Sequence, residues 1–301
     1  MSKKIYTIEE TKKIANSIRK QILGITLNSG GCYLAQACSS AELVAALYTQ
    51  IMNLGPSTAN FDPMPFPGVP SPENMDYQKG AAYHGAPTPE NDRFFVSCCH
   101  YASVIYAALA AVERLTPNWV DKFNVDGWNM EMIGAEHSPG FENSAGSLGQ
   151  TISIAGGTAH AKKMKGESGK IYCMLGDGEL QEGQLWECIQ TASYYKLDNL
   201  IIVIDVNGQQ VEGATCDQMD MGSLEDKFTA FGAACQTCDG HDVQQIIDAS
   251  KVDHKDKPLI IICNTRGTTG MPPLEKNWPL LHFVKINESD RDVFEKIYNE
   301  L

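Results

Sequence analysis

Two polar clusters in the sequence each follow an apolar run rich in β-branched residues, and their side chains are of the types that bind a metal ion. Gly176-Asp177-Gly178 follows the run that begins at Ile171, and Asp205-Val206-Asn207 ends the next such run. These runs are typical of buried strands, and a parallel sheet brings the loops at the carboxyl ends of its strands together. Mg²⁺ binds carboxylate, amide and carbonyl oxygens. We therefore expect Asp177, Asn207 and a backbone carbonyl of the following Gly208-Gln209 to meet at one divalent cation.

Taken alone, the turn at Asp177 is weak evidence, because Asp-Gly pairs are common in ordinary turns. A single carboxylate with one amide is also a poor cage for a free Mg²⁺ ion, which requires octahedral oxygen coordination. The set is better suited to a cation that arrives with a diphosphate, whose oxygens complete the coordination shell. The pattern thus favours a phosphorylated cofactor over a structural metal.

Two glutamates, Glu182 and Glu187, are predicted to lie on the helix between the two apolar runs. Five positions apart, they differ by about 140° around a helix, so their side chains do not reach the same small site. We expect one to face the pocket and the other to face a neighbour. A solvated helix face is the alternative, because ionised carboxylates are rarely buried.

Three histidines, His100, His137 and His282, precede or follow predicted loops near strand ends. Any one of them alone would be assigned to the surface or to a helix cap. Together they predict a polar pocket in which imidazoles hydrogen-bond phosphate or transfer protons. The loop Gly146-Ser147-Leu148 precedes a predicted helix and is rich in free backbone N–H groups.

The elements that must position these residues follow from periodicity and capping patterns. Thr7 with Glu10 predicts the start of an N-terminal helix, and Ser39 with Glu42 repeats this capping box for a second helix. Strand and helix patterns alternate from residue 93 to residue 263, and a final helix is expected at about 289–301. Near-continuous apolar strands that alternate with helices predict an α/β fold with a doubly wound, mostly parallel sheet flanked by helices. We expect one domain over residues 1–301.

A proline-rich segment interrupts this alternation at about residues 55–92, where eight of the fourteen prolines lie. Regular structure is not expected there, and we predict a long surface loop. A disordered linker is the alternative, which Phe61, Phe66 and Tyr77 would oppose by pinning the segment to the body.

The composition argues against several classes of function. A net charge of −13 without a Lys/Arg cluster disfavours nucleic acid or an anionic membrane as the main partner. The sequence contains no Gly-x-Ser-x-Gly motif, Walker motif or Gly-x-Gly-x-x-Gly motif, which are the usual marks of a hydrolase, an ATPase and a nicotinamide-dependent enzyme respectively. The ten cysteines lack zinc-site spacing, and no signal peptide or transmembrane run is seen, which fits a reduced cytoplasm. We expect Cys235 and Cys238 to be two strand positions facing the core rather than a redox or metal pair.

The longest motif resembles the thiamine diphosphate motif of transketolases. It comprises Gly176-Asp177-Gly178-Glu179-Leu180-Gln181-Glu182-Gly183, then Asn199-Leu200 to Asp205-Val206-Asn207, and Glu212-Gly213-Ala214-Thr215. Four further segments resemble family segments and occur in the same order along the chain: Asp92-Arg93-Phe94 with His100, Ser138-Pro139-Gly140-Phe141-Glu142 through Gly149-Gln150, Asp239-Gly240-His241-Asp242, and Thr265-Arg266-Gly267. The resemblance covers nearly the whole chain.

The resemblance implies a thiamine-diphosphate-binding fold, a Mg²⁺ ion and ketol transfer from a ketose phosphate to an aldose phosphate. It assigns Mg²⁺ to Asp177, Asn207 and the carbonyl of Gln209, and places Glu182 and Glu187 at the subunit contact that links two active sites. His282 corresponds to the family's late histidine only in approximate position. The implied catalytic residues are His100, His282, Glu182 and Glu187, and the implied cofactor-binding residues are His100, Gly146, Ser147, Leu148, Gly176, Asp177, Gly178, Glu182, Asn207 and His282.

The chain is about half of a full transketolase, which implies the N-terminal subunit of a split enzyme. A separate C-terminal subunit would supply the activating glutamate, in an assembly expected to be a heterotetramer. The family's Gly-His-Pro-Gly segment is here Cys32-Tyr33-Leu34-Ala35, Ser147 replaces a usual proline, the segment before His137 is shortened, and the proline-rich loop is an insertion. Because these departures are expected on the substrate side, the donor is open to branched or sulfonated ketoses. The alternatives are a 2-oxo acid dehydrogenase or decarboxylase component and a non-catalytic cofactor-holding subunit.

Overall fold

The N-terminal helix begins at the predicted capping box. In this computed structural model, which describes residues 4–75 and 77–301, helix α1 spans Ile8–Asn28. The backbone N–H of Glu10 donates to Thr7 Oγ1 (3.2 Å), and the backbone N–H of Thr7 donates to Glu10 Oε2 (2.7 Å). Two of the first turn's free N–H groups are thus satisfied, as a capping box requires.

The centre of the molecule is a five-stranded sheet, which confirms the predicted fold class. Its strands are β1 (Arg93–Val96), β2 (Ile171–Gly176), β3 (Leu200–Val206), β6 (Ala234–Asp239) and β7 (Leu259–Asn264). They lie in the order β1-β2-β3-β7-β6 and every neighbouring pair is parallel. All five carboxyl ends therefore point to one edge of the sheet. Two short antiparallel strands, β4 (Gln209–Gln210) and β5 (Gly213–Ala214), follow β3.

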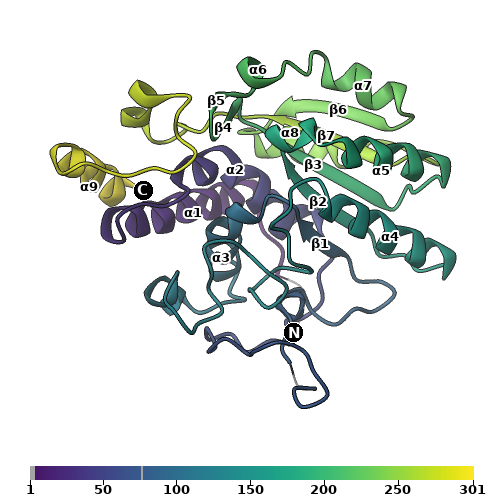
Figure 1. Ribbon diagram of the computed structural model, residues 1–301, viewed down its shortest axis with the longest axis horizontal. Helices are drawn as coiled ribbons and strands as arrows, with labels where there is room; N and C mark the ends of the chain where they lie inside the picture. The colour runs from purple at the N-terminus through teal and green to yellow at the C-terminus, as the bar shows by residue number, and fades with distance from the viewer. Residues whose placement is uncertain (1–3, 76) are drawn as a thin grey trace.

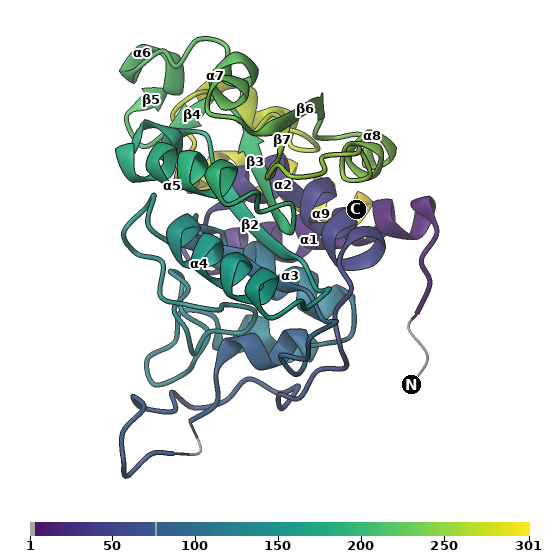
Figure 2. The ribbon, with the colours of Figure 1, turned by 90° about the vertical axis from the view of Figure 1, so that its right-hand side faces the viewer.

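Helices cover both faces of the sheet (Figures 1 and 2). One face packs against α1, α2 (Leu34–Ala46), α3 (Ala102–Ala111) and α8 (Val243–Ala249). The other packs against α4 (Thr151–Met164), α5 (Gly183–Tyr194) and α7 (Leu224–Ala230). Successive strand residues face opposite layers, as Val203 and Ile204 do. The last helix, α9 (Arg291–Glu300), lies beside α1, and a short helix, α6 (Thr215–Gln218), follows β5. No helix in the described ranges is long and apolar enough to cross a bilayer.

The proline-rich segment is an extended loop with one short 3₁₀ helix, Gly80–His84, which lies next to the edge strand β1. Arg114 fastens it, because its two terminal nitrogens donate to Tyr83 O (2.7 Å) and Gly55 O (2.9 Å). The ring of Phe66 also packs on the ring of His137, with centroids 4.7 Å apart. These contacts favour a pinned loop over a disordered linker.

The sequence led us to expect this insertion on the substrate side, and the structure locates its two ends. They meet at the amino edge of the sheet, where the backbone N–H of Asp92 donates to Asn53 O (3.0 Å). That edge is opposite the carboxyl ends of the strands, where ligands bind in parallel sheets. The ends of the loop therefore lie away from the carboxyl edge, and the 3₁₀ helix Gly80–His84 within it packs beside β1.

Replacing Gly80 by alanine is expected to destabilise the attachment of this loop. A Cβ at Gly80 would lie 1.7 Å from the backbone oxygen of Ser138, and relieving such an overlap costs about 1–3 kcal/mol. Urea unfolding should show this loss. Gly157→Ala on α4 is the matched control, because no described heavy atom other than those of its chain neighbours and the backbone of its own helix lies within 4 Å of its Cβ position, and its stability should be equal or higher. Equal stability of the Gly80 variant would contradict the prediction.

The predicted start of the second helix was wrong. Helix α2 begins at Leu34, so Ser39 and Glu42 lie inside it and do not form a capping box. Their side chains make tertiary contacts instead, since Ser39 Oγ donates to Asp205 Oδ2 (2.6 Å) and Glu42 accepts from Arg19. The helix then continues into a π turn at Leu47–Ile51.

The two cysteines of Cys235-x-x-Cys238 lie on opposite faces of β6, and each packs against one of the two apolar layers, which agrees with the prediction that both are strand positions facing the core. Cys238 is buried with its Sγ 3.7 Å from Cys263 Sγ, whereas Cys235 is half-buried against the other layer. Three positions along a strand reverse the direction of the side chain. The two thiols therefore cannot share a metal or form a disulfide with each other.

Candidate functional site

Asp177 lies at the carboxyl end of β2, where three donors fix its side chain. Its Oδ1 accepts from the backbone N–H of Gly178 (2.9 Å), and its Oδ2 accepts from the backbone N–H of Gly208 (2.8 Å) and the hydroxyl of Thr215 (3.1 Å). Gly208 directly follows Asn207, so the loops after β2 and β3 meet as the sequence predicted. The carboxylate is buried, with 6% of the residue exposed.

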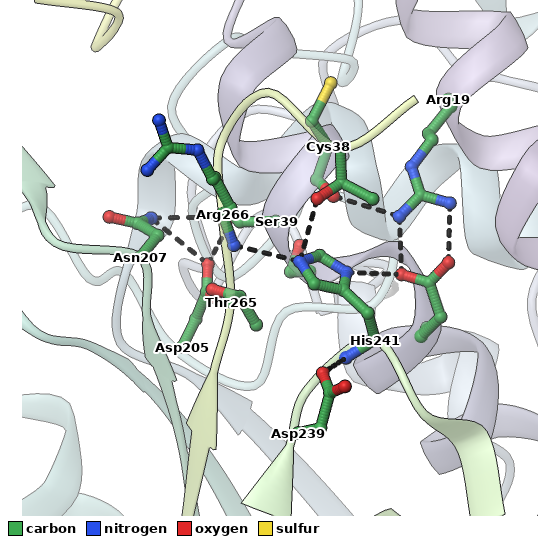
Figure 3. A network of polar contacts seen from close by, with 12 residues as sticks. Arg19, Cys38, Ser39, Asp205, Asn207, Asp239, His241, Thr265 and Arg266 are labelled. Atoms are coloured by element: carbon green, nitrogen blue, oxygen red, sulfur yellow. Dashed lines mark hydrogen bonds and ion pairs between the residues drawn. The ribbon is translucent and has the colours of Figure 1, made fainter. Parts of the chain in front are cut away.

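A second buried carboxylate, Asp205, organises the end of β3 and was missed at the sequence level (Figure 3). It accepts hydrogen bonds from Ser39 Oγ (2.6 Å), Tyr101 Oη (2.7 Å) and the hydroxyl of Thr265. Asn207 Nδ2 lies 3.3 Å from the same carboxylate. The sequence could have predicted that Asp205 orients Asn207, since residues two positions apart along a strand point to the same face.

The charge balance of this region fits a cation. Burial raises the pKa of Asp205, and burial together with the nearby Asp205 raises the pKa of Asp177 to about 6. A positive charge would favour the ionised forms. In residues 4–75 and 77–301 no group of three or more His, Cys, Asp or Glu is placed to hold a metal by itself. A cation here would therefore need further oxygens from a ligand.

Buried polar atoms without partners also point to a ligand next to Asp177. A cavity of about 260 Å³ is lined by Asp177, Gly208, Thr215 and Trp278, among mainly apolar neighbours. The indole Nε1–H of Trp278, which lines this cavity, is buried without a hydrogen bond to a described residue, and so are both polar atoms of the Gln209 side chain, which lies in the loop after Asn207 against Gly267. Such orphaned groups are costly unless something pairs with them. Together with the two carboxylates, they fit a phosphate-bearing cofactor that carries a divalent cation.

Glu179 is a further residue that sequence reasoning left without a role. Its side chain is buried and accepts from the hydroxyl of Ser97, from the N–H of Gly149 (2.6 Å) and from the N–H of Gly176 (3.4 Å). It thereby ties the ends of β1 and β2 to the loop Gly146-Ser147-Leu148, whose residues are exposed. Nothing in the sequence separates such a glutamate from a solvated one.

The structure brings His100 and His282 together but not His137. The rings of His100 and His282 lie 4.9 Å apart, and both lie 5.4 Å from the ring of Tyr33. Burial lowers the pKa of His100 to about 3, and burial also lowers the pKa of His282, so both imidazoles are neutral. His137 instead hydrogen-bonds to Glu131 and makes an edge-to-face contact with Phe66 of the proline-rich loop. Its predicted place in the polar pocket was wrong, because a loop contact that the sequence does not reveal holds it elsewhere.

Glu182 and Glu187 are exposed and separated, and only Glu187 lies on the predicted helix. Glu182 precedes α5 as its N-cap residue, because a short 3₁₀ turn at Gly178–Gln181 comes between β2 and the helix. Its Cβ packs against Gly149, and any side chain at position 149 would overlap with it, because a Cβ added there would lie 2.6 Å from Glu182 Cβ. Glu187 lines a groove between α4 and α5 together with Gly156, Gly157 and His160.

A buried ion-pair network supports the loop after β7, as Figure 3 shows. Arg19 donates to both oxygens of Glu42 (2.6 and 2.5 Å), and Glu42 Oε2 lies 3.1 Å from His241 Nδ1. The other ring nitrogen, Nε2, accepts from the backbone N–H of Arg266 (2.9 Å). That loop carries Thr265, which reaches Asp205. The network therefore connects helices α1 and α2 to the carboxyl edge.

Sequence comparison gives a consistent set of similarities. A family model described as "Transketolase, thiamine diphosphate binding domain" matches residues 82–291. A putative uncharacterized transketolase family protein of Sinorhizobium fredii is 31% identical over 92% of this chain and 90% of its own length. An apulose-4-phosphate transketolase subunit of Actinobacillus succinogenes is 30% identical, over 89% and 88% respectively. The 6-deoxy-6-sulfo-D-fructose transketolase subunit of a Clostridium species is 32% identical, over 83% and 82%.

Longer relatives match this chain over part of their length. Human transketolase-like protein 2 is 30% identical over 91% of this chain but only 40% of its own length. Among solved structures, a transketolase from Campylobacter jejuni superposes with a TM-score of 0.77 at 21% identity, covering 98% of this chain and 43% of that one. The described fold is thus the fold of the corresponding part of that structure.

Proposed function

Because this chain belongs to the transketolase family and contains its thiamine-diphosphate-binding domain, we propose that it is the N-terminal subunit of a split transketolase. It would transfer a two-carbon ketol unit from a ketose phosphate to an aldose phosphate. The observation that carries the proposal is the meeting of Asp177 and the Asn207 loop beside orphaned polar groups. In the family this site belongs to the diphosphate end of the cofactor.

In this proposal Asp177, Asn207 and the carbonyl of Gln209 hold Mg²⁺. Thiamine diphosphate, when bound, supplies the carbon nucleophile and the electron sink for breaking and forming the carbon–carbon bond. The protein orients the reactants and excludes water. Asp205 orients the Asn207 side chain by accepting a hydrogen bond from its amide nitrogen. Glu179 holds the Gly146-Ser147-Leu148 loop next to the site by accepting from the N–H of Gly149.

The two histidines have the protonation state that proton transfer requires. A neutral imidazole can accept a proton from a substrate hydroxyl at one nitrogen and donate a hydrogen bond from the other. Burial keeps His100 and His282 in this neutral form. We assign to them the protons that move on the donor and acceptor sugars.

A partner subunit is part of the proposal. Since the chain spans 40% of the human relative and 43% of the Campylobacter chain, a C-terminal subunit would supply the rest of the active site. We propose a heterotetramer in which the exposed Glu182 and Glu187 lie at subunit contacts. A cytoplasmic location agrees with the ten cysteines, all of which are free thiols.

The donor sugar is proposed to differ from an ordinary pentose phosphate. Two relatives are described as acting on apulose 4-phosphate and on 6-deoxy-6-sulfo-D-fructose, and Tyr33 stands where the family has a histidine-bearing segment. A branched or sulfonated ketose is therefore the first donor to test.

The decisive experiment is reconstitution. The purified chain, mixed with its proposed C-terminal partner subunit, thiamine diphosphate and Mg²⁺, should transfer ketol units from at least one of four donors: apulose 4-phosphate, 6-deoxy-6-sulfofructose, xylulose 5-phosphate and fructose 6-phosphate. Neither protein should be active on its own, because each carries half of the site. Absence of transfer with all four donors, from an assembly that binds the cofactor, would refute the proposed function.

A further inference from the structure

Two buried thiols lie in contact on neighbouring strands of the sheet. Cys238, near the end of β6, and Cys263, near the end of β7, are directly opposite each other in the parallel pairing of these strands, and their Sγ atoms lie 3.7 Å apart. Cys263 is fully buried, and 7% of Cys238 is exposed. The proposed ketol transfer uses neither thiol, so the pair is a candidate for chemistry of its own.

The backbone around these two residues is close to what a disulfide requires. Neighbouring strands lie about 4.7–4.9 Å apart, which falls within the Cα separation of about 4.4–6.8 Å that disulfides span. A disulfide also brings the two Cβ atoms to about 3.5–4.5 Å, so the strands must approach each other slightly. A bond formed in this way is strained, and strained disulfides are the easily reduced ones. The pair therefore fits a reversible bond better than a permanent structural one.

The surroundings of the two thiols differ, and the difference separates an attacking thiol from a resolving one. β6 is an edge strand of the sheet, and both neighbours of Cys238 along it, Thr237 and Asp239, are exposed. The hydrogen bond between the thiols lowers the pKa of Cys238 and raises the pKa of Cys263. The thiolate is the reactive form of cysteine, and local opening of an edge strand admits small reagents. Cys238 is thus the thiol that an oxidant reaches first, with Cys263 behind it.

We propose that Cys238 and Cys263 are an oxidation site at which a hydroperoxide forms a reversible disulfide, and that this bond weakens cofactor binding at the adjoining edge of the sheet. The Cys238 sulfur attacks one peroxide oxygen and the O–O bond breaks. With hydrogen peroxide, the departing hydroxide takes the thiol proton and leaves as water, and Cys238 becomes a sulfenic acid. The Cys263 sulfur then attacks the Cys238 sulfur, the S–O bond breaks, and the second hydroxide leaves as water with the Cys263 proton. The two sulfurs lose two electrons, which the peroxide gains.

The effect on the cofactor follows from what the ends of the two strands support. Two positions after Cys263, the hydroxyl of Thr265 donates to Asp205, the carboxylate that orients a proposed Mg²⁺ ligand (Figure 3). Gly240, two positions after Cys238, packs tightly on the same segment, since its Cβ position lies 2.3 Å from Thr265 Cγ2 and 3.0 Å from Cys263 Cβ. Because β7 lies between β3 and β6, drawing its end towards β6 moves Thr265 away from Asp205 on β3. Close-packed interiors transmit such a shift.

Peptide mapping of the purified chain tests the bond without cofactor or partner subunit. The chain is treated with hydrogen peroxide, the remaining thiols are alkylated, and the protein is digested without a reducing agent. Trypsin places Cys238 and Cys263 on different peptides, residues 228–251 and 256–266. We expect these two peptides to be linked in most of the oxidised chain and separate after treatment with dithiothreitol.

Matched variants make the mapping specific. Cys235→Ser removes the other thiol of peptide 228–251, which packs against the opposite layer, and should leave the link unchanged. Cys238→Ser should lose the link, and Cys238→Ala provides the same test if the serine variant does not fold. The proposal would be overturned by a link through Cys235. It would also be overturned by separate peptides at a peroxide concentration that oxidises the exposed Cys216.

Cofactor binding tests the second part of the proposal, which rests on the proposed function. Binding of thiamine diphosphate with Mg²⁺ to the chain assembled with its partner subunit should be measured by calorimetry before oxidation, after oxidation and after reduction. We expect Kd to rise about 3- to 10-fold on oxidation, the size of one lost hydrogen bond, and to return on reduction. Cys238→Ser should show neither change.

The outcomes separate the two parts from each other and from the proposed function. Linked peptides with an unchanged Kd would establish the oxidation site and refute its effect on the cofactor. An assembly that binds no cofactor even when reduced would refute the proposed function and this effect together, while linked peptides would still establish the site.

Discussion

Replacing Asp177 by alanine is expected to abolish ketol transfer by the assembled enzyme, with a loss of at least about a thousandfold in kcat/KM. The variant removes the only carboxylate among the proposed Mg²⁺ ligands, and it frees the N–H of Gly208 and the hydroxyl of Thr215 from their acceptor. Titration with thiamine diphosphate and Mg²⁺, followed by intrinsic fluorescence, should show that cofactor binding is lost. Full activity of the variant would instead identify this chain as a non-catalytic member of the assembly.

The same position allows loss of function to be separated from loss of fold. Asp177→Asn keeps one acceptor oxygen and removes a carboxylate whose charged form burial and the nearby Asp205 already disfavour, so it should lower the unfolding temperature of the chain without cofactor by only about 2–4 °C, the size of one lost hydrogen bond. Wild type should gain stability when cofactor and Mg²⁺ are added, whereas Asp177→Asn should gain none. Asp217→Ala, an exposed acid on α6, is the control and should behave as wild type in both measurements.

Arg19→Met is expected to be among the most destabilising single substitutions in this chain, at about 3–5 kcal/mol, because it leaves the buried Glu42 carboxylate without its main partner. The side chains of Arg19 and Glu42 are only 3% and 11% exposed. Arg19 also donates to Cys38 O (2.9 Å), so the change frees a backbone acceptor as well. Urea unfolding of the isolated chain gives the measurement.

Two further variants make this prediction specific. Lys12→Met on the same helix breaks an exposed pair with Glu9, whose side chains are 53% and 74% exposed, and should change stability by less than about 1 kcal/mol. Adding Glu42→Leu to Arg19→Met should recover much of the loss, since no unpaired charge then remains. A single Arg19 variant as stable as the Lys12 variant would show that the buried pair contributes little.

The sheet and the core of the site follow from local sequence patterns. Near-continuous apolar runs bounded by turns predict parallel strands, and the parallel arrangement alone brings Asp177 and Asn207 to one edge. The same logic placed His100 and His282 at strand or loop ends, where the structure has them in contact. These inferences depend on strand direction and side-chain type, which the sequence carries directly.

Other features depend on contacts between distant segments, which a single sequence does not show. Ser39 and Glu42 match a capping box by spacing, yet Asp205 and Arg19 bind them inside a helix. His137 lies in a suitable loop but is held by Glu131 and Phe66. Tyr33 stands out only when the segments around residues 33, 100 and 282 are folded together.

The pairing of the two ends of the chain has a consequence for synthesis. Gln36 Nε2 donates to the backbone oxygen of His282, 246 positions away, and so holds the ring cluster formed by Tyr33, His100 and His282. The hydrogen bond from Arg291 Nη1 to Leu27 O spans 264 positions. Contacts of such separation form late, because closing a long loop costs entropy before any contact forms. On a ribosome that adds about 5–20 residues per second, the loops of Asp177 and Asn207 emerge several seconds before residue 282 does. A nascent chain would therefore assemble its diphosphate side first and complete the ring cluster around Tyr33 only near the end of translation.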